Sequence, residues 1–561
     1  MGAADGTDYA AFRAAFRVED LAAELSGDLR AGLNVCYECC DRHAASGRIA
    51  LYWEGKDGRS ARLRFDELQQ SSARFASFLS SRGVAPGDRV AVLLPRTPEL
   101  LVAALGCWRA GAVYQPLFTA FGPKAIEYRL ERGGARLIVT DREQRAKLEG
   151  VDALPEVVTV AGDSAAPLAA GDFDFWRELD RHSSVFDPVP RGADDPFLLL
   201  FTSGTVGSAK GVAVPQQALL SFLAYMRFGI GLRDADAYWN VADPGWAYGL
   251  YYAIVGPLLL GHATTLYEGS FSVESTYRVL GKYRISNLAA APTVYRMLLA
   301  AGGEPARALR GGLRSASSAG EPLNPEVIRW VERHLGCAIH DHYGQTELGI
   351  AIGNSDAFRY ARHPGSMGLP LPGFRAVLLG DRFEELGPGR AGQIAIDRAR
   401  SPLYWFPGYW QQPTASCFHG PYYLTGDTAE LAEDGSFTFV GRKDDLITSA
   451  GYRIGPFDVE SCLIEHAAVA ESAVIGKPDA ERTELVKAFV VLRPGFAGSA
   501  ELVAALQQLV KQRLSAHAYP REIEFVDELP KTPSGKIQRF VLRAREVEQA
   551  RERSGRPGEP N

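Results

Sequence analysis

Up to Gly373, short apolar runs with strand character alternate with longer stretches whose apolar residues recur at helical spacing. Asp66 to Arg82 has the helical spacing, and Arg89 to Leu94 is typical of the strand that follows it. The tripeptide Thr97-Pro98-Glu99 then supplies an N-cap, a first-turn proline and an acidic first turn for a helix that ends near Ala110. This alternation predicts parallel α/β sheets. Further strands are predicted over residues 49–54, 136–140, 157–160 and 287–290, and peripheral helices over residues 1–30.

The pattern changes after Gly373. Phe374 to Leu379, Gln393 to Ile396 and Thr428 to Val440 alternate partly with period two, and Asp434-Gly435 is a hairpin signal. These segments predict a small β-barrel-like unit. Beyond residue 443, two strands at 473–476 and 487–492 and an amphipathic helix at 500–514 indicate a separate α+β domain.

The chain is therefore predicted to fold as an α/β protein with a large N-terminal domain over residues 1–443. That domain contains two parallel α/β subdomains and the small β-barrel-like subdomain. A smaller, mobile α+β domain is expected over 444–545, and residues 546–561 are expected to form a charged, disordered tail.

Composition excludes several classes of partner. The chain has 561 residues, 46% hydrophobic and 23% charged, with a net charge of −6, so it lacks the basic character of a nucleic-acid-binding protein. Its longest apolar runs, such as Tyr251 to Leu260, are too short to span a bilayer, and its N-terminus has no secretory signal pattern. Seven scattered cysteines favour a reducing compartment, which predicts a cytoplasmic protein without a membrane partner.

Cys36, Cys39, Cys40 and His43 form a group that could suggest a metal site. The segment from Asn34 to His43 is predicted to be helical, and no second ligand pair with matching spacing lies near it in the sequence. We therefore interpret these cysteines as packing residues.

A glycine-rich loop follows the apolar run Phe197 to Phe201. Glycines let backbone N–H groups converge, and hydroxyls and an ammonium add donors and charge, which suits a polyphosphate. The loop is not a Walker A sequence, because Gly211 follows Lys210. The alternative interpretation of this segment is a flexible surface loop without a ligand. Pro215, which follows it, is expected to begin the next helix. The predicted phosphate-binding residues are Thr202, Ser203, Gly204, Thr205 and Lys210.

Six further motifs follow this loop in order: 320–322 (GEP), 341–347 (DHYGQTE), 423–427 (YLTGD), 441–444 (GRKD), 451–453 (GYR) and 530–536 (PKTPSGK). Together they resemble the adenylate-forming superfamily of acyl-CoA synthetases, luciferases and peptide-synthetase adenylation domains, over roughly residues 30 to 545. Asn34 to Glu54 and Ala242 to Gly269 look most like the acetyl- and medium-chain acyl-CoA synthetase branch.

The resemblance implies an ATP site in the N-terminal domain. A carboxylate must acquire a leaving group before a thiol can displace its oxygen, and attack on the ATP α-phosphate provides one as acyl-AMP. Cations and hydrogen-bond donors should stabilise the charge of that step. Glu347 is expected to bind Mg²⁺ and Thr346 the α-phosphate. The remaining residues implied to contact ATP or AMP are Gly320, Glu321, Pro322, Asp341, His342, Tyr343, Gly344, Gln345, Asp427, Arg442 and Arg453.

The resemblance also implies a mobile C-terminal domain. Lys536 matches the family's catalytic lysine, and Asp444 matches its hinge. Rotation about the hinge would withdraw the lysine and bring Gly451 to the acyl-AMP, where the absent side chain leaves room for the thiol of CoA. Lys511 is a weaker candidate for a CoA phosphate contact. The segment around His466 is left unassigned.

Trp246, Ala247, Tyr248, Ala319 and Gly344 are the implied acyl-pocket residues. Gly344 departs from the acetyl-like branch, which has a bulky Trp there, so a wider pocket is expected. Tyr248 adds bulk and a hydroxyl. Ala209 replaces the proline that usually precedes the loop lysine, which removes no ligand.

These features predict an AMP-forming acyl-CoA synthetase that uses ATP, Mg²⁺ and CoA to activate a medium-chain, branched or aromatic carboxylic acid. Three alternatives remain open: an enzyme that loads a carrier protein, a short-chain acetate or propionate ligase, and a nucleotide-binding protein without turnover. The lack of a carrier domain makes the first less favoured. A homodimer is compatible with the sequence.

Overall fold

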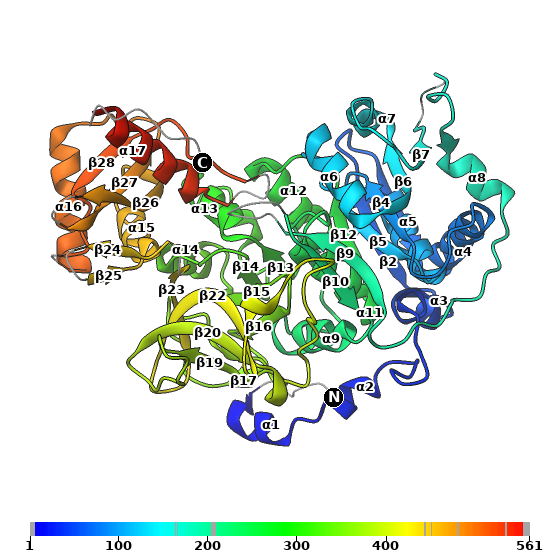
Figure 1. Cartoon of the computed structure of the whole chain (residues 1–561), viewed down its shortest axis with the longest axis horizontal. Helices are drawn as coiled ribbons and strands as arrows, with labels where there is room; N and C mark the ends of the chain where they lie inside the picture. Colours follow the sequence, from blue (N-terminus) through cyan, green and yellow to red (C-terminus); the bar gives the residue numbers. More distant parts are fainter. Residues whose placement is uncertain are drawn as a thin grey trace.

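The computed structural model describes residues 6–553 except for 163, 165, 203–208, 443–444, 450–451, 480–481, 516 and 533–535, and the side chains of Arg453 and 550–553 are also outside the description. Figure 1 shows the N-terminal α/β layers in blue, cyan and green, the β-rich unit in yellow below them, and the C-terminal α+β domain in orange and red at one side. The fold class predicted from the sequence is confirmed, with two mainly parallel α/β units, a β-rich unit and a C-terminal α+β domain.

The first sheet has seven strands in the order β10-β9-β5-β4-β6-β7-β8. All neighbours are parallel except β9 and β10, which are antiparallel. Helices α4 (Phe65–Ser81), α5 (Pro98–Arg109), α6 (Pro123–Gly133) and α8 (Phe175–Arg181) connect or cover its strands. The strands are β4 (Arg89–Leu93), β5 (Val113–Pro116), β6 (Ala135–Asp141), β7 (Glu156–Val160), β8 (Phe173–Asp174), β9 (Pro196–Phe201) and β10 (Gly211–Pro215).

The second sheet has six strands in the order β11-β13-β14-β15-β16-β18, the first four of them parallel. The carboxyl ends of parallel strands form the edge where open α/β sheets bind ligands. Two of the predicted site motifs lie there, because β14 ends at Ala319 and β15 ends at Gln345. The strands are β11 (Tyr238–Asn240), β13 (Asn287–Ala290), β14 (Ser315–Ala319), β15 (Ala338–Gln345), β16 (Gly349–Gly353) and β18 (Leu369–Pro370), and helices α12 (Val273–Lys282), α13 (Pro292–Ala300) and α14 (Pro325–His334) accompany them.

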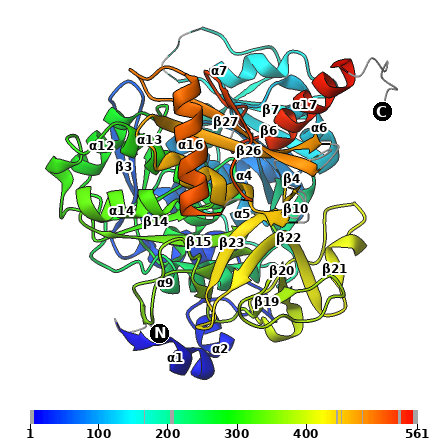
Figure 2. The same ribbon diagram turned by 90° about the vertical axis from the view of Figure 1, so that its left-hand side faces the viewer.

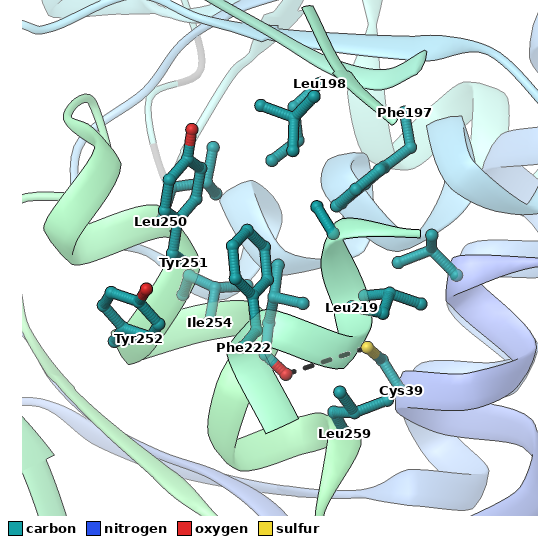
Figure 3. Packing of buried hydrophobic residues seen from close by; sticks show 14 of the residues in the cluster. Cys39, Phe197, Leu198, Leu219, Phe222, Leu250, Tyr251, Tyr252, Ile254 and Leu259 are labelled. Atoms are coloured by element: carbon teal, nitrogen blue, oxygen red, sulfur yellow. Dashed lines mark hydrogen bonds between the residues drawn. The ribbon is translucent and has the colours of Figure 1, made fainter. Parts of the chain in front are cut away.

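The buried helix α9 (Ala218–Phe228) and the π-helix η3 (Leu250–Val255) pack together in the largest core cluster. Figure 3 shows Phe222 of α9 lying against Tyr251 and Tyr252, and the Phe222 and Tyr251 rings stack with centroids 4.5 Å apart. Apart from Ser221 and Arg227, α9 is apolar on all sides, and such a helix is stable only inside the protein. It therefore fixes the second sheet against the three-stranded sheet β12-β2-β3, formed by β2 (Ile49–Glu54), β3 (Ser60–Arg64) and β12 (Thr264–Tyr267).

The cysteine group lies in this core. Cys39 Sγ donates to the carbonyl oxygen of Val255 at 3.8 Å, and Cys40 Sγ donates to that of Phe65 at 3.4 Å. Burial raises the pKa of the Cys39 thiol well above its ordinary value, so it stays protonated. The packing interpretation is confirmed. The predicted helix is present as the π-helix η1 (Tyr37–Asp41) followed by α3 (Arg42–Ala44).

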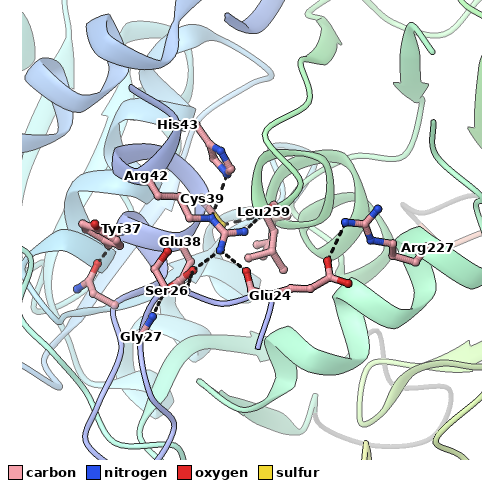
Figure 4. A network of polar contacts seen from close by, with 12 residues as sticks. Glu24, Ser26, Gly27, Tyr37, Glu38, Cys39, Arg42, His43, Arg227 and Leu259 are labelled. Carbon is pink, nitrogen blue, oxygen red and sulfur yellow. Dashed lines mark hydrogen bonds and ion pairs between the residues drawn. The ribbon is translucent and has the colours of Figure 1, made fainter. Parts of the chain in front are cut away.

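A polar network fixes this N-terminal segment to the core (Figure 4). Arg42 pairs with the buried carboxylate of Glu38 at 2.7 Å and donates to the carbonyl oxygens of Glu24 and Leu259. Glu24 in turn pairs with Arg227 of α9 at 2.7 Å. Because the Glu38 charge is fully paired, its burial is tolerated. The network ties α2 (Val18–Ala22), preceded by α1 (Tyr9–Ala15), to α9.

The β-rich unit is a five-stranded antiparallel sheet, and the hairpin predicted at Asp434-Gly435 lies between β22 and β23. Its strands are β19 (Ala376–Leu379), β20 (Ala391–Asp397), β21 (Phe418–His419), β22 (Tyr422–Leu431) and β23 (Phe437–Arg442). The C-terminal domain packs α15 (Pro456–Ile464), α16 (Ala500–Arg513) and α17 (Arg539–Arg553) on a second five-stranded sheet, as Figure 2 shows for α16 beside β26 and β27. That sheet contains β24 (Ile447–Ser449), β25 (Tyr452–Ile454), β26 (Val469–Asp479), β27 (Thr483–Leu492) and β28 (Glu522–Phe525).

Two expectations are wrong. Pro215 ends β10 rather than beginning a helix, because residues 211–215 pair with β9, and α9 begins at Ala218. Residues 546–561 were expected to form a disordered tail, but residues 546–553 belong to helix α17. Glu546 is buried there against Lys487 at 2.6 Å, and this contact explains why the helix continues. Residues 554–561 lie outside the described residues.

No helix in the described part of the chain is long and apolar enough to cross a membrane.

Candidate active site

The glycine-rich loop joins the antiparallel strands β9 and β10. Its two ends are held together, because Thr202 N donates to Lys210 O at 2.9 Å and Lys210 N donates to Thr202 Oγ1 at 3.2 Å. Tyr128 on α6 donates to the carbonyl oxygen of Ala209 at 3.0 Å. The loop therefore begins and ends on a rigid hairpin base. Ser203, Gly204 and Thr205 lie outside the described residues.

Glu347 and Lys210 meet at Tyr409. The Tyr409 hydroxyl donates to Glu347 Oε1 at 2.8 Å, and Lys210 Nζ lies 4.7 Å from the centre of the Tyr409 ring. Tyr409 is placed by a backbone bridge to Val212. Burial raises the pKa of the Glu347 carboxyl, and the Tyr409 hydrogen bond opposes this effect. One aromatic side chain thus contacts both groups, because its hydroxyl binds the Glu347 carboxylate and its ring lies beside the Lys210 ammonium.

Asp427 is the centre of a second group of contacts. Its Oδ2 accepts hydrogen bonds from the Tyr343 hydroxyl at 2.6 Å and from Gln345 Nε2 at 2.7 Å. Arg442, opposite Asp427 in the β22–β23 register, lies 3.6 Å from its Oδ1. Burial raises the Asp427 pKa, and the charges of Arg442 and of Lys536 lower it.

Asp341 and His342 are buried neighbours in the middle of β15. Burial raises the pKa of Asp341 to about 8 and lowers that of His342 to about 3, so both are predominantly neutral at pH 7. His342 is held by the Tyr225 hydroxyl on Nδ1 at 2.7 Å and by the carbonyl oxygen of Asn354 on Nε2 at 2.9 Å. This part of the site carries little charge of its own.

Gly320, Glu321 and Pro322 form the turn after β14, where Gly320 has a φ of +99° that favours glycine. Glu321 accepts from Arg296 of α13 at 2.7 Å and from Thr293 at 3.2 Å. Its carboxylate is therefore oriented before any ligand arrives. Thr346 is half-buried, and its carbonyl oxygen accepts from the Tyr251 hydroxyl at 2.9 Å.

The predicted acyl-pocket residues come from two elements. Trp246, Ala247 and Tyr248 lie at the start of α10 (Ala247–Gly249), and all three are half-buried. Trp246 packs against Phe118 and Phe121, with ring centroids 5.5 and 5.6 Å apart. Ala319 lies at the end of β14, whose register places it beside His342 of β15.

Gly344 has a packing requirement that the sequence did not reveal. A Cβ on Gly344 would lie 2.1 Å from the carbonyl oxygen of Gly349, because β15 and β16 approach closely at a bulge. Glycine is thus required by the backbone in this arrangement. Its role as the missing wall of a wider pocket stays a prediction.

Lys536 is exposed on a tight loop of the C-terminal domain. Its backbone N donates to Thr532 Oγ1 at 3.0 Å, and Thr532 N donates to Lys536 O at 2.7 Å. The domain contacts the N-terminal domain through Ser461, whose Oγ accepts from Asn324 Nδ2 at 2.9 Å. This hydrogen bond joins α15 of the C-terminal domain to the residue that precedes α14.

Of the remaining predicted positions, only Lys511 has a described side chain, and that side chain does not contact this group. Asp444 and Gly451 lie outside the described residues, as does the side chain of Arg453. Lys511 is exposed on α16, with its Nζ 4.0 Å from the centre of the Tyr519 ring.

Sequence reasoning missed Tyr409, Tyr225 and Arg296, which contact Glu347, His342 and Glu321. None of these three belongs to a glycine-rich or acidic motif. The segment 406–410 (FPGYW) offered the one usable signal, since an aromatic pair after Pro-Gly is unusual for a solvated turn. The contacts themselves depend on tertiary structure.

The arrangement can bind and polarise a phosphorylated ligand. Lys210, Arg442 and Lys536 supply positive charge, Asp427 supplies acceptors for hydroxyl groups, and Tyr343 supplies an aromatic surface. Of the described residues, no group of three or more His, Cys, Asp or Glu side chains could hold a metal ion by itself. A single buried carboxylate such as Glu347 instead suits Mg²⁺, which keeps waters and takes substrate phosphates as its other ligands.

Comparison with known proteins gives consistent matches along the chain. Residues 39–410 match the family model described as AMP-binding enzyme, and residues 458–536 match that of the AMP-binding enzyme C-terminal domain. An acetyl-coenzyme A synthetase of Bacillus subtilis is 40% identical over 525 residues, 92% of this chain and 91% of that protein. A mitochondrial acyl-coenzyme A synthetase of Mus musculus is 36% identical over 509 residues, covering 89% and 86% of the two chains.

Solved structures give similar matches. A crystal structure of an acyl-CoA synthetase of Brucella canis is 52% identical, with a TM-score of 0.79 over 97% of this chain and 100% of that one. An anthranilate CoA ligase in complex with anthranoyl-AMP is 26% identical, with a TM-score of 0.86 over 95% and 100%.

Proposed function

The chain belongs to the family of AMP-binding enzymes and is an AMP-forming acid–CoA ligase that uses ATP, Mg²⁺ and CoA, and we propose that its substrate is a medium-chain, branched or aromatic carboxylic acid. The observation that carries the proposed site is the pair of hydrogen bonds that Asp427 Oδ2 accepts from the Tyr343 hydroxyl and from Gln345 Nε2, because they join two of the predicted motifs at one carboxylate. In the proposed site, Asp427 accepts the ribose hydroxyls and Lys536 approaches the reacting carboxylate.

In the proposed first step, a carboxylate oxygen of the acid attacks the α-phosphorus of ATP. The bond from that phosphorus to the bridging oxygen breaks, and pyrophosphate leaves with the electron pair. Lys536 stabilises charge on the carboxylate and on the α-phosphate oxygens, and Thr346 donates to the α-phosphate. These interactions strengthen as the new bond forms, which is the condition for catalysis.

The remaining ATP contacts are proposed by position. Thr202, Lys210 and the loop between them bind the β- and γ-phosphates, and Arg442 contacts the ribose. Gly320, Glu321, Pro322 and Tyr343 surround the adenine, with Asp341, His342, Gly344 and Gln345 behind them. Gln345 supports this arrangement, because its amide nitrogen donates both to Asp427 and to the carbonyl oxygen of Thr425 at 2.8 Å.

Glu347 is the residue proposed to hold Mg²⁺. Its carboxylate is 8% exposed, and Tyr409 fixes one oxygen, so the other can face the phosphates. When bound, the ion neutralises phosphate charge. Lys210 adds a second positive charge beside the ring of Tyr409.

In the proposed second step, the C-terminal domain rotates about the hinge at Asp444. The sulfur of CoA then attacks the acyl carbon, and AMP leaves with the electron pair. Gly451 lines the path of the thiol and Lys511 contacts a CoA phosphate. The domains themselves are proposed to divide at residues 443 and 444.

A medium-chain or aromatic acid is supported by two small residues at predicted pocket positions, Ala247 at the start of α10 and Ala319 at the end of β14. A short-chain acid is the second candidate, since the Bacillus subtilis relative is an acetyl-coenzyme A synthetase. A carrier protein is the alternative acceptor to CoA. We further propose a cytoplasmic enzyme that forms homodimers.

Acid-dependent exchange of pyrophosphate into ATP tests the proposal. We expect exchange with hexanoate, benzoate and branched acids at a higher kcat/KM than with acetate. Folded protein that supports no exchange across this panel would reject the adenylation proposal, and a preference for acetate would select the short-chain alternative. Thioester yield on CoA against a phosphopantetheinyl carrier protein then identifies the acceptor.

A further inference from the structure

Helix α17 follows the loop of Lys536 and is held largely by charged side chains. It begins at Arg539, shortly after the lysine. Among its described side chains, only those of Leu542 and Glu546 are buried. A helix with so little apolar contact is weakly fixed by packing. Its position, and that of the neighbouring lysine loop, therefore depends on its ion pairs.

Two arginines, Arg539 and Arg543, lie on one face of α17, because residues four positions apart in a helix are neighbours. Arg539 donates to the carboxylate of Glu460 on α15 through Nε at 3.0 Å and through Nη2 at 2.7 Å. Glu460 is buried and also accepts from the backbone N of Val474 at 2.8 Å. This pair fixes the start of α17 to the core of the C-terminal domain.

The second arginine reaches the residue that follows the proposed hinge. Arg543 Nη2 donates to Asp445 Oδ1 at 2.6 Å, and Arg539 Nη1 lies 3.8 Å from Asp445 Oδ2. The side chains of Arg543 and Asp445 are 26% and 15% exposed, so water screens their attraction only in part. Helix α17 is thereby tied to the chain directly beside Asp444.

Asp445 is also placed relative to the proposed ATP-binding residues. Its backbone N and that of Leu446 donate to the carbonyl oxygen of Arg442, at 2.9 and 3.1 Å. Arg442 in turn lies 3.6 Å from Asp427 Oδ1. A continuous series of contacts therefore leads from the Asp427 carboxylate to Arg543 and α17.

The proposed rotation would interrupt this series at one point. The two backbone hydrogen bonds to Arg442 span residues 443 and 444, so they persist only while the hinge keeps its present dihedral angles. The pair of Asp445 and Arg543 lies wholly within the C-terminal domain and moves with it. The pair therefore sets where Lys536 lies relative to Asp427 before the rotation, but not after it.

We propose that Arg543 is a positioning residue for adenylation, whose ion pair with Asp445 holds Lys536 in place for the reaction of the acid with ATP. The proposal rests on the proposed catalytic role of Lys536 and adds the side chain that fixes the lysine. A misplacement of about 1 Å can lower a rate about 100-fold. An ion pair that merely stabilised the domain would affect both half-reactions alike.

Arg543→Ala tests the proposal in the two half-reactions. We expect kcat for pyrophosphate exchange to fall about 10- to 100-fold, with little change in the KM for the acid. Thioester formation from supplied acyl-AMP should stay within about twofold of wild type, because Lys536 does not act in that step. Equal loss of both half-reactions would overturn the proposal.

Asp445→Asn examines the other half of the ion pair. It removes the negative charge and keeps the size of the side chain, so exchange should fall by a factor similar to that in Arg543→Ala. The double variant should be no worse than either single variant, because both substitutions break the same pair. Wild-type exchange in Asp445→Asn would show that the pair does not position the lysine.

A double-mutant cycle with Lys536→Ala separates positioning from general support of the fold. If Arg543 acts through Lys536, adding Arg543→Ala to the Lys536→Ala enzyme should change the residual exchange by less than about twofold. An unchanged effect of Arg543→Ala in the two backgrounds would overturn the proposal, since independent effects multiply.

Arg545→Ala is the matched control. Arg545 lies on the same helix and pairs with Glu524 of β28, so this variant also removes an ion pair between α17 and the rest of the domain. Its partner lies on the sheet instead of beside the hinge. We expect both half-reactions to stay near wild type. A loss of exchange equal to that in Arg543→Ala would overturn the assignment, because any weakening of α17 would then suffice.

The single variant Lys536→Ala distinguishes failure of the proposed function from failure of the present proposal. If Lys536→Ala keeps wild-type exchange, the lysine is not catalytic and both proposals are wrong. If Lys536→Ala loses exchange while Arg543→Ala keeps it, only the positioning role of Arg543 is overturned.

Discussion

The Tyr409 hydroxyl lies 2.8 Å from Glu347 Oε1 and donates the hydrogen bond that orients this buried carboxylate. The two residues are 62 positions apart in the sequence. The ring of Tyr409 also lies under Lys210 Nζ, so one side chain joins the base of the glycine-rich loop to the proposed magnesium ligand. Tyr409 is a positioning residue in this arrangement.

Tyr409→Phe removes the hydroxyl and keeps the ring. Hydrogen bonds to charged groups contribute about 1.5–3 kcal/mol, so we expect the Mg²⁺ concentration for half-maximal exchange to rise about tenfold or more. The variant should keep its affinity for the acid. Titration of Mg²⁺ at fixed ATP, together with calorimetric binding of MgATP, measures the change.

Tyr409→Leu is the companion variant, since it also removes the ring from Lys210. It should weaken MgATP binding further than Tyr409→Phe. If both variants show the wild-type Mg²⁺ dependence, Tyr409 does not position Glu347.

Lys536→Ala tests the alternating domain. We expect pyrophosphate exchange to fall about 100- to 1,000-fold, the usual effect of removing a group that stabilises developing charge. Formation of thioester from supplied acyl-AMP should be little changed, because Lys536 acts only in the first step of the proposed mechanism. Separate assays of the two half-reactions give the comparison.

Lys531→Ala is the control for this prediction. Lys531 pairs with Glu471 at 2.8 Å inside the C-terminal domain, on the same loop as Lys536. It should leave both half-reactions near wild type. Equal loss of both half-reactions in Lys536→Ala would contradict the assignment of the lysine to adenylation.

Local sequence patterns correctly predicted those elements of the fold that depend only on a short segment of the chain. The strand over residues 49–54, the helix after Thr97 and the hairpin at Asp434-Gly435 all have their expected form. Each depends on apolar period, capping or turn chemistry within a short segment. Pro215 was predicted wrongly because its strand is defined by pairing with β9, and such pairing is not a local property.

In the candidate site, too, residues within motifs were predicted from the sequence, whereas contacts between distant segments were not. Asp427, Tyr343 and Gln345 lie in recognisable motifs, and the structure brings them into direct contact. Tyr225 reaches His342 across 117 positions, and no pattern within either segment encodes that contact. The reason for glycine at position 344 was also invisible, since it depends on the approach of another strand.

Gly344→Ala should destabilise the N-terminal domain. The added Cβ would lie 2.1 Å from the carbonyl oxygen of Gly349, and a backbone contact of this kind is relieved only by moving a strand. Overpacking of this type costs about 1–3 kcal/mol or more. We expect a thermal midpoint several degrees below wild type by differential scanning calorimetry.

Gly387→Ala provides the comparison, because a Cβ at Gly387 has no atom within 4 Å. Its midpoint should stay close to wild type. A stable Gly344→Ala variant that merely prefers shorter acids would instead support the pocket-wall role of this position.

Asp341 should make the enzyme less stable as the pH rises. Its pKa is about 8 in the folded protein against 3.8 for an ordinary aspartate. Between these values the unfolded chain loses the proton and the folded protein keeps it, so the free energy of unfolding decreases with rising pH and levels off above about pH 8. Each pH unit within this window is worth about 1.4 kcal/mol.

Asp341→Asn removes this titration while keeping the size of the side chain. Urea unfolding of the N-terminal domain at pH 5 and pH 7 measures the effect. Between these two pH values we expect the free energy of unfolding of the variant to rise by about 2–3 kcal/mol relative to that of wild type. Asp152→Asn, at a solvent-exposed position, is the control and should track wild type at both values. A difference between Asp341→Asn and wild type that is the same at pH 5 and pH 7 would show that Asp341 is already ionised in the folded enzyme.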